Sequence, residues 1–183
     1  LKNNKGTEDN RVRHMDYGVQ FNKLMYERLL SGGDITLFSP SDVPGLYEAF
    51  FNDQDEFKYL YEKAEIHPNI RKKSIPAIDL FSQFMEERKN TGRIYLMNVD
   101  HANTHSSFIE KVAPVHQSNL CCEIDLPTKP LNHFNDEEGE IALCTLSAIN
   151  WGKISKPIDF QKPCELAVRG LDALLDYQDY PVK

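Results

Sequence analysis

The sequence contains no long hydrophobic run, and its first residues, Leu1-Lys2-Asn3-Asn4, are not followed by an apolar core. A helix that spans a bilayer needs about 20 predominantly apolar residues in a row, and a secretory signal needs an apolar stretch near the N-terminus. We therefore expect no membrane-spanning segment and no membrane partner. The composition favours a soluble, cytoplasmic protein.

Clustered positive charge is also missing. The chain has 21 Lys and Arg residues against 28 Asp and Glu residues, which gives a formal net charge of −7. The densest basic cluster is Arg71-Lys72-Lys73. Because nucleic-acid binding depends on clustered Lys and Arg side chains that contact phosphates, we expect no nucleic-acid partner.

Cysteine is scarce, and the four cysteines, Cys121, Cys122, Cys144 and Cys164, form no CxxC pair. No small disulfide framework is indicated, so we expect free thiols. Cys121 and Cys122 do not favour a disulfide with each other, because neighbouring side chains of a strand point to opposite faces. The sequence also contains no phosphate-binding loop and no Gly-x-Ser-x-Gly elbow, which leaves a P-loop nucleotide site and a serine hydrolase without support.

His101 and His105 are four residues apart, a spacing that lets two imidazoles on one helix bind the same metal. Asn103 and Thr104 between them favour a polar loop, and no glutamate motif accompanies the pair. We expect no metal site. A zinc protein that uses His101, His105 and a cysteine is the alternative.

The chain has no initiator methionine and stops directly after a predicted helix, at Tyr180-Pro181-Val182-Lys183. We expect it to be a piece of a longer polypeptide. Its 183 residues, of which 40% are hydrophobic, suffice for one domain with a buried core.

Periodic apolar residues predict helices and strands that alternate along the chain. Apolar spacings of three and four predict helices, and short β-prone runs predict strands. The predicted helices are 9–31, a segment from Ser41 or Asp42 through Phe51, 56–64, 74–89 and 159–176. The predicted strands are 35–38, 93–99, 117–124 and 141–148, the last straight or bent, with a loop over 100–115. This alternation favours a largely parallel α/β architecture.

The strongest chemical signal lies in the predicted strand 117–124. In an extended backbone, a side-chain period of two places Asn119, Cys121 and Glu123 on one face. An amide, a thiol and a carboxylate would then share one small volume, with apolar neighbours on the opposite face. The alternative is structural, because a buried cysteine usually behaves as a small hydrophobic side chain.

Several stretches resemble the catalytic subunit of class I ribonucleotide reductases. The resemblance runs through the whole chain, in order and in one register. It is carried by residues 10–17, 38–40, 91–95, 118–123, 126–130, 139–148 and 174–178. It is closest to the aerobic Ia branch. A bacteriophage version is one source that it allows, in which case the protein would act in the host cytoplasm.

The resemblance implies a role for each matching residue. Cys121 matches the cysteine that becomes a thiyl radical and takes the 3′ hydrogen of the substrate ribose. Glu123 matches the carboxylate that accepts the proton of the 3′-hydroxyl. Asn119 matches the amide that hydrogen-bonds the substrate hydroxyls, so Ser118, Asn119 and Glu123 are the predicted substrate-binding residues. Cys144, 23 positions after Cys121, matches one member of the redox pair that reduces the ribose.

The resemblance also implies a fold and a set of partners. Residues 1–183 would be a single segment of a ten-stranded α/β barrel, with the catalytic cysteine on an extended finger loop and Cys122 as a bystander. No cofactor is expected in this segment. The intact enzyme is expected to need a small subunit with a diiron-tyrosyl radical, and thioredoxin or glutaredoxin as reductant. It is also expected to bind nucleoside triphosphate effectors and to form a homodimer.

The predicted function is the reduction of ribonucleoside diphosphates to 2′-deoxyribonucleoside diphosphates by thiyl-radical chemistry, which supplies DNA precursors. The fragment is expected to be inactive alone, because the partner of Cys144 and the tyrosines that pass the radical lie outside it. The alternative is a non-catalytic or assembly-dependent piece of a split reductase.

Overall fold

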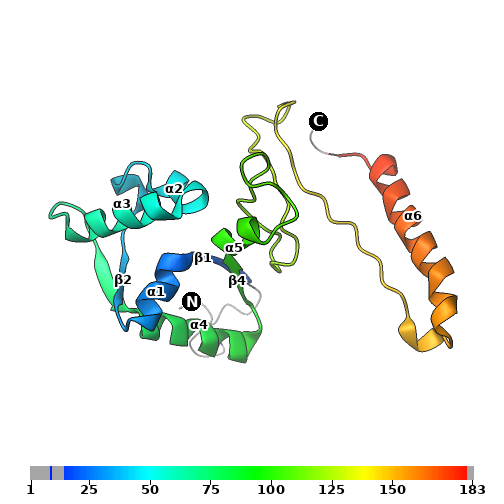
Figure 1. Ribbon diagram of the computed structural model, residues 1–183. Coiled ribbons are helices and arrows are strands. Elements are labelled where there is room, and N and C mark those ends of the chain that lie inside the picture. The colour runs from blue at the N-terminus through cyan, green and yellow to red at the C-terminus, as the bar shows by residue number, and fades with distance from the viewer. Residues whose placement is uncertain (1–8, 10–14, 181–183) are drawn as a thin grey trace. The chain divides into compact units, whose positions relative to one another are not determined.

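The computed structural model describes Asp9 and residues 15–180 (Figure 1). Two compact units, divided between Pro127 and Thr128, make up this part of the chain. The first unit holds the strands β1 to β4 and the helices α1 to α5, and the second holds the long helix α6.

The first unit alternates short strands with helices. Its elements are β1 (Tyr17–Phe21), α1 (Lys23–Leu30), β2 (Asp34–Leu37), the 3-10 helix η2 (Pro40–Asp42), α2 (Leu46–Asn52), α3 (Gln54–Ile66), β3 (Lys73–Pro76), α4 (Ala77–Thr91), β4 (Ile94–Asn98) and α5 (Val99–Thr104). The second unit contains the 3-10 helices η3 (Trp151–Lys153) and η4 (Pro157–Phe160), followed by α6 (Gln161–Tyr177).

β1 and β4 form a parallel two-stranded sheet, in which Tyr17 pairs with Ile94 and Phe21 with Asn98. One face of this sheet packs on α1 and α4 and forms the centre of a hydrophobic cluster. In that cluster Phe21 is fully buried and stacks on Phe81, with ring centroids 5.1 Å apart. Because side chains alternate along a strand, the other face of the sheet carries Gly18, Gln20, Tyr95 and Met97.

The predicted helix over 9–31 is wrong at β1 and right at α1, while residues 10–14 lie outside the described residues. Tyr17, Val19 and Phe21 place large side chains at alternate positions, which suits a strand. Gly18 is a weak helix former. Parallel pairing with β4 therefore overrides the helical spacing of the apolar residues. α1 ends before Gly32, whose φ of 67° is the left-handed conformation that glycine adopts most easily.

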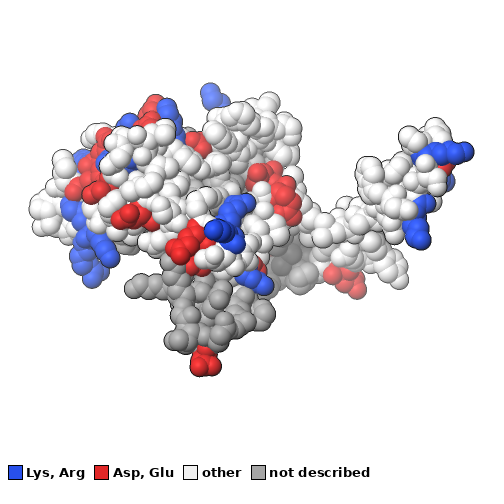
Figure 2. All heavy atoms as spheres, turned by 90° about the horizontal axis from the view of Figure 1, so that it is seen from below, with Lys and Arg blue, Asp and Glu red and all other residues white. Residues whose placement is uncertain are grey.

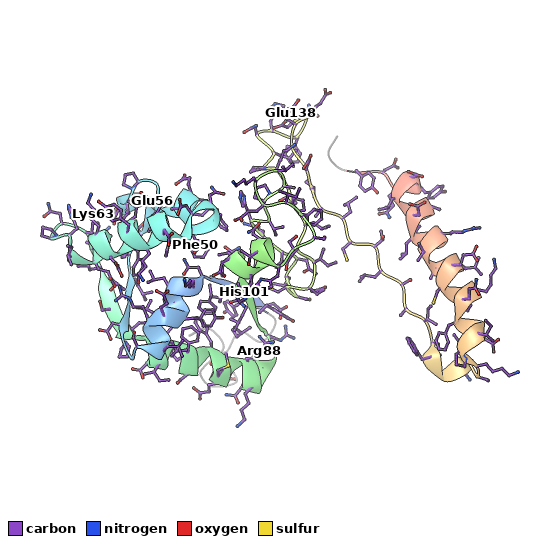
Figure 3. All side chains as sticks on the ribbon, viewed as in Figure 1. Phe50, Glu56, Lys63, Arg88, His101 and Glu138 are labelled. Carbon is purple, nitrogen blue, oxygen red and sulfur yellow. The ribbon has the colours of Figure 1, made fainter. Side chains whose placement is uncertain are left out.

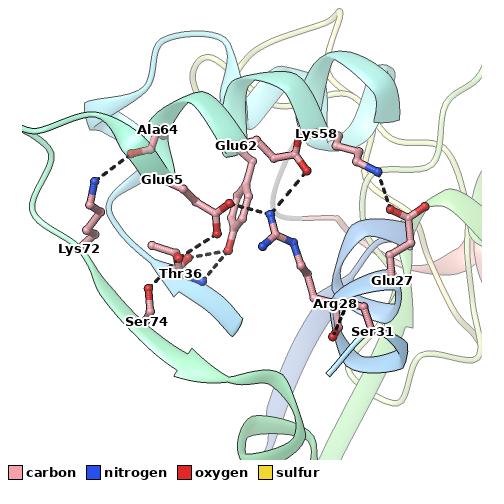
Figure 4. Close-up of polar contacts among 11 residues, drawn as sticks. Glu27, Arg28, Ser31, Thr36, Lys58, Glu62, Ala64, Glu65, Lys72 and Ser74 are labelled. Atoms are coloured by element: carbon pink, nitrogen blue, oxygen red, sulfur yellow. Dashed lines mark hydrogen bonds and ion pairs between the residues drawn. The ribbon is translucent and has the colours of Figure 1, made fainter. Parts of the chain in front are cut away.

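β2 and β3 pair in antiparallel orientation, so the expected largely parallel architecture is only partly correct. α3 packs beside β2, where the Tyr61 hydroxyl donates to the Thr36 carbonyl (2.8 Å) and accepts from the Thr36 N–H (2.7 Å). Burial raises the pKa of Tyr61. Glu65 joins α1 to β2, because it pairs with Arg28 at 2.6 Å and accepts from the Thr36 hydroxyl at 2.9 Å (Figure 4).

Several other predicted elements of the first unit are confirmed with shifted ends. α2, α3 and β4 lie where they are predicted, and the Asp53 side chain caps the start of α3 by accepting from the N–H groups of Asp55 and Glu56. The helix predicted over 74–89 begins only at Ala77, because residues 73–76 pair with β2. The loop predicted over 100–115 contains the short helix α5.

The second unit begins with a loop closed by a backbone bridge between Lys129 and Glu140. The carboxylate of Asp136 accepts from the N–H groups of Asn132 and Glu138, both at 2.8 Å. An added Cβ at Gly139 would lie 2.8 Å from the Leu131 side chain, so the close approach requires glycine. The loop is therefore held together by its own short-range contacts.

The strand predicted over 141–148 is not formed, since these residues take no regular secondary structure. The helix predicted over 159–176 is confirmed as α6, but none of its residues is buried. The described residues thus form a mixed α/β segment with two small sheets, and no closed barrel is present among them.

No helix of the described residues combines the length and the apolar character needed to cross a membrane. On the face drawn in Figure 2, Lys and Arg side chains lie among Asp and Glu side chains. That face therefore lacks the large patch of cations that contacts with a phosphate backbone need.

Candidate active site

The chain that leads into the predicted site is held by Asn103 of α5. The Asn103 side-chain amide donates to the Val115 carbonyl (2.9 Å) and accepts from the Val115 N–H (2.8 Å), as a neighbouring strand would. It also donates to the Val99 carbonyl (2.9 Å). Asn103 and Val115 are buried. Losing these bonds would leave buried polar groups unpaired, which makes the attachment costly to break.

Gln20 of β1 holds the next residue. Its side-chain amide donates to the His116 carbonyl (2.8 Å) and lies 3.4 Å from the Met97 sulfur. The His116 ring lies 5.0 Å from the ring of Phe51 on α2. Three elements of the first unit thus contact residues 115–116, shortly before Asn119.

Residues 119–124 form a tight turn, and the extended strand or extended loop expected here is wrong. The Cys122 N–H donates to the Asn119 carbonyl (3.1 Å), and the Asn119 N–H donates to the Ile124 carbonyl (3.3 Å). Cys122 has a φ of 58° and, among the described residues, is the one non-glycine residue with positive φ. A left-handed residue reverses the chain and interrupts the two-residue alternation of faces.

The Asn119 side chain holds this turn and brings the predicted amide and carboxylate together. Its Oδ1 accepts from the N–H groups of Glu123 (3.2 Å) and Ile124 (3.1 Å), and its Nδ2 donates to Glu123 Oε1 (2.5 Å). The Ser118 hydroxyl donates to the Asn119 carbonyl (2.8 Å). Asparagine favours such short-range bonds to nearby backbone groups. The contact between Asn119 and Glu123 therefore arises from a turn rather than from a strand face.

Cys121 lies within this turn as an exposed, free thiol. Tyr95 of β4 is close to it. Burial raises the pKa of the Tyr95 phenol, and the Cys121 thiol and Asp16 raise it further, while Arg93 opposes the shift. Asp16 and Arg93 pair with each other at 3.3 Å. A tyrosine hydroxyl that stays protonated can both donate and accept a hydrogen bond at this position.

A cavity of about 340 Å³ adjoins the turn. It is lined by Gly18, Val19, Gln20, Met97, Cys122 and the segment 117–120. Gly18 and Gln20 of β1 therefore border this cavity together with the segment 117–120 that leads into the turn. Such a concave space with a few polar groups is typical of a binding site.

A second cavity of about 430 Å³ lies between α5 and the segment that follows the turn, and His101, His105, Cys122 and Asp125 are among its lining residues. The two imidazoles are in contact, with centroids 4.9 Å apart, and Figure 3 shows His101 on α5. Burial raises the pKa of Asp125. Among the described residues, no group of three His, Cys, Asp or Glu could hold a metal ion, so the zinc alternative has no ligand set there.

Cys144 belongs to the second unit. It is an exposed, free thiol in the segment 141–149, which has no regular secondary structure. The predicted residues Asn119, Cys121 and Glu123 thus lie in one turn of the first unit, with Ser118 directly before it, and Cys144 is carried by the other unit.

The sequence interpretation missed the side chains that surround the turn. Gln20 falls in the part of the predicted helix that is strand β1, and Asn103 falls in the predicted loop that contains α5. Tyr95 is in a correctly predicted strand, but Gly18, the residue with which it pairs in β1, is far away in the sequence. Alternation within β1 and β4 is the one sequence signal that would have placed Gln20 and Tyr95 on a common face.

Comparison with known proteins gives consistent matches. A family model described as ribonucleotide reductase, barrel domain, matches residues 1–183. The ribonucleoside-diphosphate reductase subunit alpha of Haemophilus influenzae is 69% identical over 182 residues, and the ribonucleoside-diphosphate reductase 1 subunit alpha of Escherichia coli is 68% identical over 182 residues. The subunit alpha of Enterobacteria phage T4 is 53% identical over 188 residues. Each match covers 100% of this chain, which spans 24% of the length of each relative.

Proposed function

The chain belongs to the ribonucleotide reductase barrel-domain family, and we propose that it is the part of a ribonucleoside-diphosphate reductase catalytic subunit that carries the radical cysteine. The substrate would be a ribonucleoside diphosphate, and the product the 2′-deoxyribonucleoside diphosphate. The single observation that best supports this proposal is the turn 119–124, in which an amide and a carboxylate are hydrogen-bonded on either side of a free thiol.

The turn supplies the groups that the reaction needs. Cys121 as a thiyl radical would take the 3′ hydrogen, so that an S–H bond forms and the ribose C3′–H bond breaks. The small subunit would supply the oxidising radical. Glu123 would accept the proton of the 3′-hydroxyl, and a carboxylate suits this role as a general base. Asn119 keeps Glu123 in place through Nδ2, which fixes the direction of the base before reaction.

Ser118 and Asn119 would bind the ribose hydroxyls. The Asn119 amide has both a donor and an acceptor group, and the Ser118 hydroxyl can serve as either. Both residues border the 340 Å³ cavity beside the turn. Substrate held in or above this cavity would meet the thiol and the carboxylate from the same loop.

Cys144 would be one of the two thiols that provide electrons when the 2′-hydroxyl leaves as water. Two thiols would lose two electrons and two protons and join as a disulfide, and the 3′ hydrogen would return from Cys121 to the sugar. A separate pair is needed because the radical carrier cannot also be the reductant. The resemblance places the partner of Cys144 outside this chain.

The assignment to the aerobic Ia branch carries further expectations. The intact protein would form a homodimer, bind nucleoside triphosphate effectors, and work in the cytoplasm with a small subunit that holds a diiron-tyrosyl radical. Thioredoxin or glutaredoxin would restore the thiols. Identities of 69% and 68% to two bacterial chains, against 53% to the phage T4 chain, favour a bacterial-type sequence over a phage-type one.

The direct test is turnover by the full-length protein that carries this segment. Purified protein is incubated with a ribonucleoside diphosphate, a Ia-type small subunit and a dithiol, and deoxyribonucleotide is measured by chromatography. The proposal predicts product that depends on all three additions. No product from folded, assembled protein would contradict it. Activity restored only when the flanking segments are added as a separate polypeptide would instead support the split reductase.

A further inference from the structure

One face of the β1–β4 sheet is turned toward the loop that carries Cys121. Gly18 pairs with Tyr95 and Gln20 with Met97, so these four residues share a face. The other face is occupied by its contacts with α1 and α4. Gly18, Gln20 and Met97 line the same cavity as residues 117–120, which places the free face of the sheet against the loop.

Gln20 makes the direct link from this face to the loop. Its amide nitrogen donates to the His116 carbonyl at 2.8 Å and lies 3.4 Å from the Met97 sulfur, its neighbour across the sheet. β1 is paired with β4 along its whole length, so the glutamine side chain starts from a fixed backbone. This hydrogen bond ties His116 directly to the sheet, in addition to the Asn103–Val115 hydrogen bonds and the ring contact with Phe51.

Tyr95 lies on the same face, two residues before Met97 and opposite Gly18. An added Cβ at Gly18 would meet no atom within 4 Å. The Cys121 thiol lies close enough to the phenol to raise the pKa of Tyr95, in addition to the larger effect of burial. The strand register puts Tyr95 on the same face as Gly18, Gln20 and Met97, which line the cavity beside residues 117–120. On that face its hydroxyl can donate or accept a hydrogen bond.

We propose that Gln20 and Tyr95 are positioning residues for Cys121: Gln20 fixes the loop through His116, and Tyr95 orients the thiol. This inference rests on the proposed function, because it gives Cys121 the role of radical carrier. Transfer of a hydrogen atom requires the sulfur and the ribose carbon at a defined distance and angle. A small displacement of the loop should therefore lower the rate of the chemical step and leave substrate affinity unchanged.

The test uses the full-length protein assembled with its radical-bearing small subunit. Gln20→Met keeps the length of the side chain and removes the donor, and Tyr95→Phe removes only the hydroxyl. We expect kcat to fall about tenfold for Gln20→Met and about fivefold for Tyr95→Phe, the size of effect that one neutral hydrogen bond gives. The KM for the ribonucleoside diphosphate should stay within about twofold of the wild-type value, since the Gln20 amide is taken up by the His116 carbonyl and the ribose hydroxyls are assigned to Ser118 and Asn119.

Matched controls separate positioning from general structure. The Gln54 side chain also donates to a backbone carbonyl, that of Phe50, at 2.8 Å, but it starts from α3. Tyr59 is an exposed tyrosine of the same helix. Gln54→Met and Tyr59→Phe should leave kcat and KM at wild-type values. A merely structural effect of the Gln20 and Tyr95 substitutions would lower the midpoint of thermal unfolding without the split between kcat and KM.

Wild-type kcat in both Gln20→Met and Tyr95→Phe would overturn the proposal, and so would a raised KM at unchanged kcat. If Gln20→Met does not fold, Gln20→Glu replaces it, because it keeps the shape and places an acceptor against the His116 carbonyl. The kcat of Gln20→Glu should fall at least as far, and a wild-type kcat would again overturn the proposal.

Cys121→Ser in the same assay separates the positioning proposal from the proposed function. An inactive wild-type enzyme contradicts the proposed function, whereas active wild type, inactive Cys121→Ser and unaffected Gln20 and Tyr95 variants contradict only the positioning role.

Discussion

Two loops of this protein are each organised by one short polar side chain, Asn119 in the first unit and Asp136 in the second. Each side chain accepts hydrogen bonds from two backbone N–H groups: Asn119 from those of Glu123 and Ile124, and Asp136 from those of Asn132 and Glu138. The two side chains differ in the hydrogen-bonding groups that are left over. Asn119 has an amide N–H group left to hold Glu123, whereas Asp136 is buried and its second contact with Asn132 goes to a side-chain amide at 2.9 Å.

With the proposed function, the difference would let one kind of loop contact serve structure in one unit and chemistry in the other. A carboxylate can only accept, so all of its bonds are used to close the loop. An amide that accepts from the backbone through oxygen can still donate through nitrogen to a reactive group. The turn 119–124 therefore holds a hydrogen-bonded carboxylate next to an exposed thiol. In the loop 129–140, both oxygens of the Asp136 carboxylate accept from the backbone of the loop itself.

Removing the charge of Glu123 should have the largest effect on this comparison. Glu123→Gln still offers an oxygen to Asn119 Nδ2, so the turn should persist, but the general base is lost. We expect kcat of the full-length enzyme to fall by about 10²- to 10⁴-fold, the contribution typical of a positioned base. The measurement is steady-state turnover, with the exposed Glu110→Gln as the control for a lost surface charge. Turnover near the wild-type rate would show that Glu123 is not the base.

Making Asn119 resemble Asp136 should come next in size. Asn119→Asp keeps the acceptor for the N–H groups of Glu123 and Ile124 but replaces the donor to Glu123 with a second carboxylate. Two carboxylates at this distance repel each other and disfavour the ionised pair. We expect kcat to fall by about 10²-fold, since both the direction and the charge of the base are disturbed.

The reciprocal change, Asp136→Asn, should leave kcat within about twofold, because its loop supplies stability only. Equal losses of kcat in the two variants would remove the distinction between the loops.

Acid should loosen the second loop. Backbone hydrogen bonds from Asn132 and Glu138 lower the pKa of Asp136 below its ordinary value of 3.8. A carboxyl with a depressed pKa in the folded state contributes stability above its unfolded value, and this stability is lost as the pH falls through the folded value. The N–H groups of Asn132 and Glu138 should therefore lose protection from hydrogen exchange, relative to the rate of an unstructured peptide at the same pH, below about pH 4. In Asp136→Asn this loss of protection on acidification should be absent, and an unchanged pH dependence of protection would contradict the role of the carboxylate.

Cys122 should give the smallest effect. Its positive φ costs a non-glycine residue about 1 kcal/mol or somewhat more, so Cys122→Gly should keep the turn and raise the free energy of unfolding by up to about 1 kcal/mol. Cys122→Val, with a β-branched side chain, should lower it instead. Denaturant unfolding of the two variants measures both changes. A glycine variant that is less stable than wild type would show that the packing of the Cys122 side chain outweighs the strain of its backbone.

Regular elements with strong local signals were predictable from the sequence. α3 and α6 follow from the three- and four-residue apolar spacing, and α4 stops where Gly92 adopts a φ of 66°. β1 was missed because its apolar residues also suit a helix, and the choice is made by pairing with β4, in which Tyr17 meets Ile94 (94 − 17 = 77 residues later).

The site was predictable in composition but not in shape. The alternation predicted Asn119 and Glu123 close together, and they are hydrogen-bonded, but through a turn and not through a shared strand face. Cysteine rarely adopts the left-handed conformation, so the sequence gives no sign of the positive φ at Cys122. The turn was therefore predicted as an extended segment. The strand predicted over 141–148 failed for another reason. The apolar side chains of Ile141, Leu143 and Leu146 are exposed, and no strand among the described residues pairs with this segment. A strand without its sheet neighbours has no ladder to fix it.

The most direct test of the central claim compares two adjacent cysteines in one turn. Full-length enzyme with Cys121→Ser or Cys122→Ser is assayed for reduction of a ribonucleoside diphosphate with its small subunit and a dithiol. Cys121→Ser should abolish turnover with the fold unchanged by circular dichroism, because a serine hydroxyl does not form the radical, while Cys122→Ser should keep turnover within about threefold of wild type, as expected for a residue with a packing role. Turnover by Cys121→Ser, or loss of turnover in Cys122→Ser alone, would contradict the assignment of Cys121 as the radical carrier.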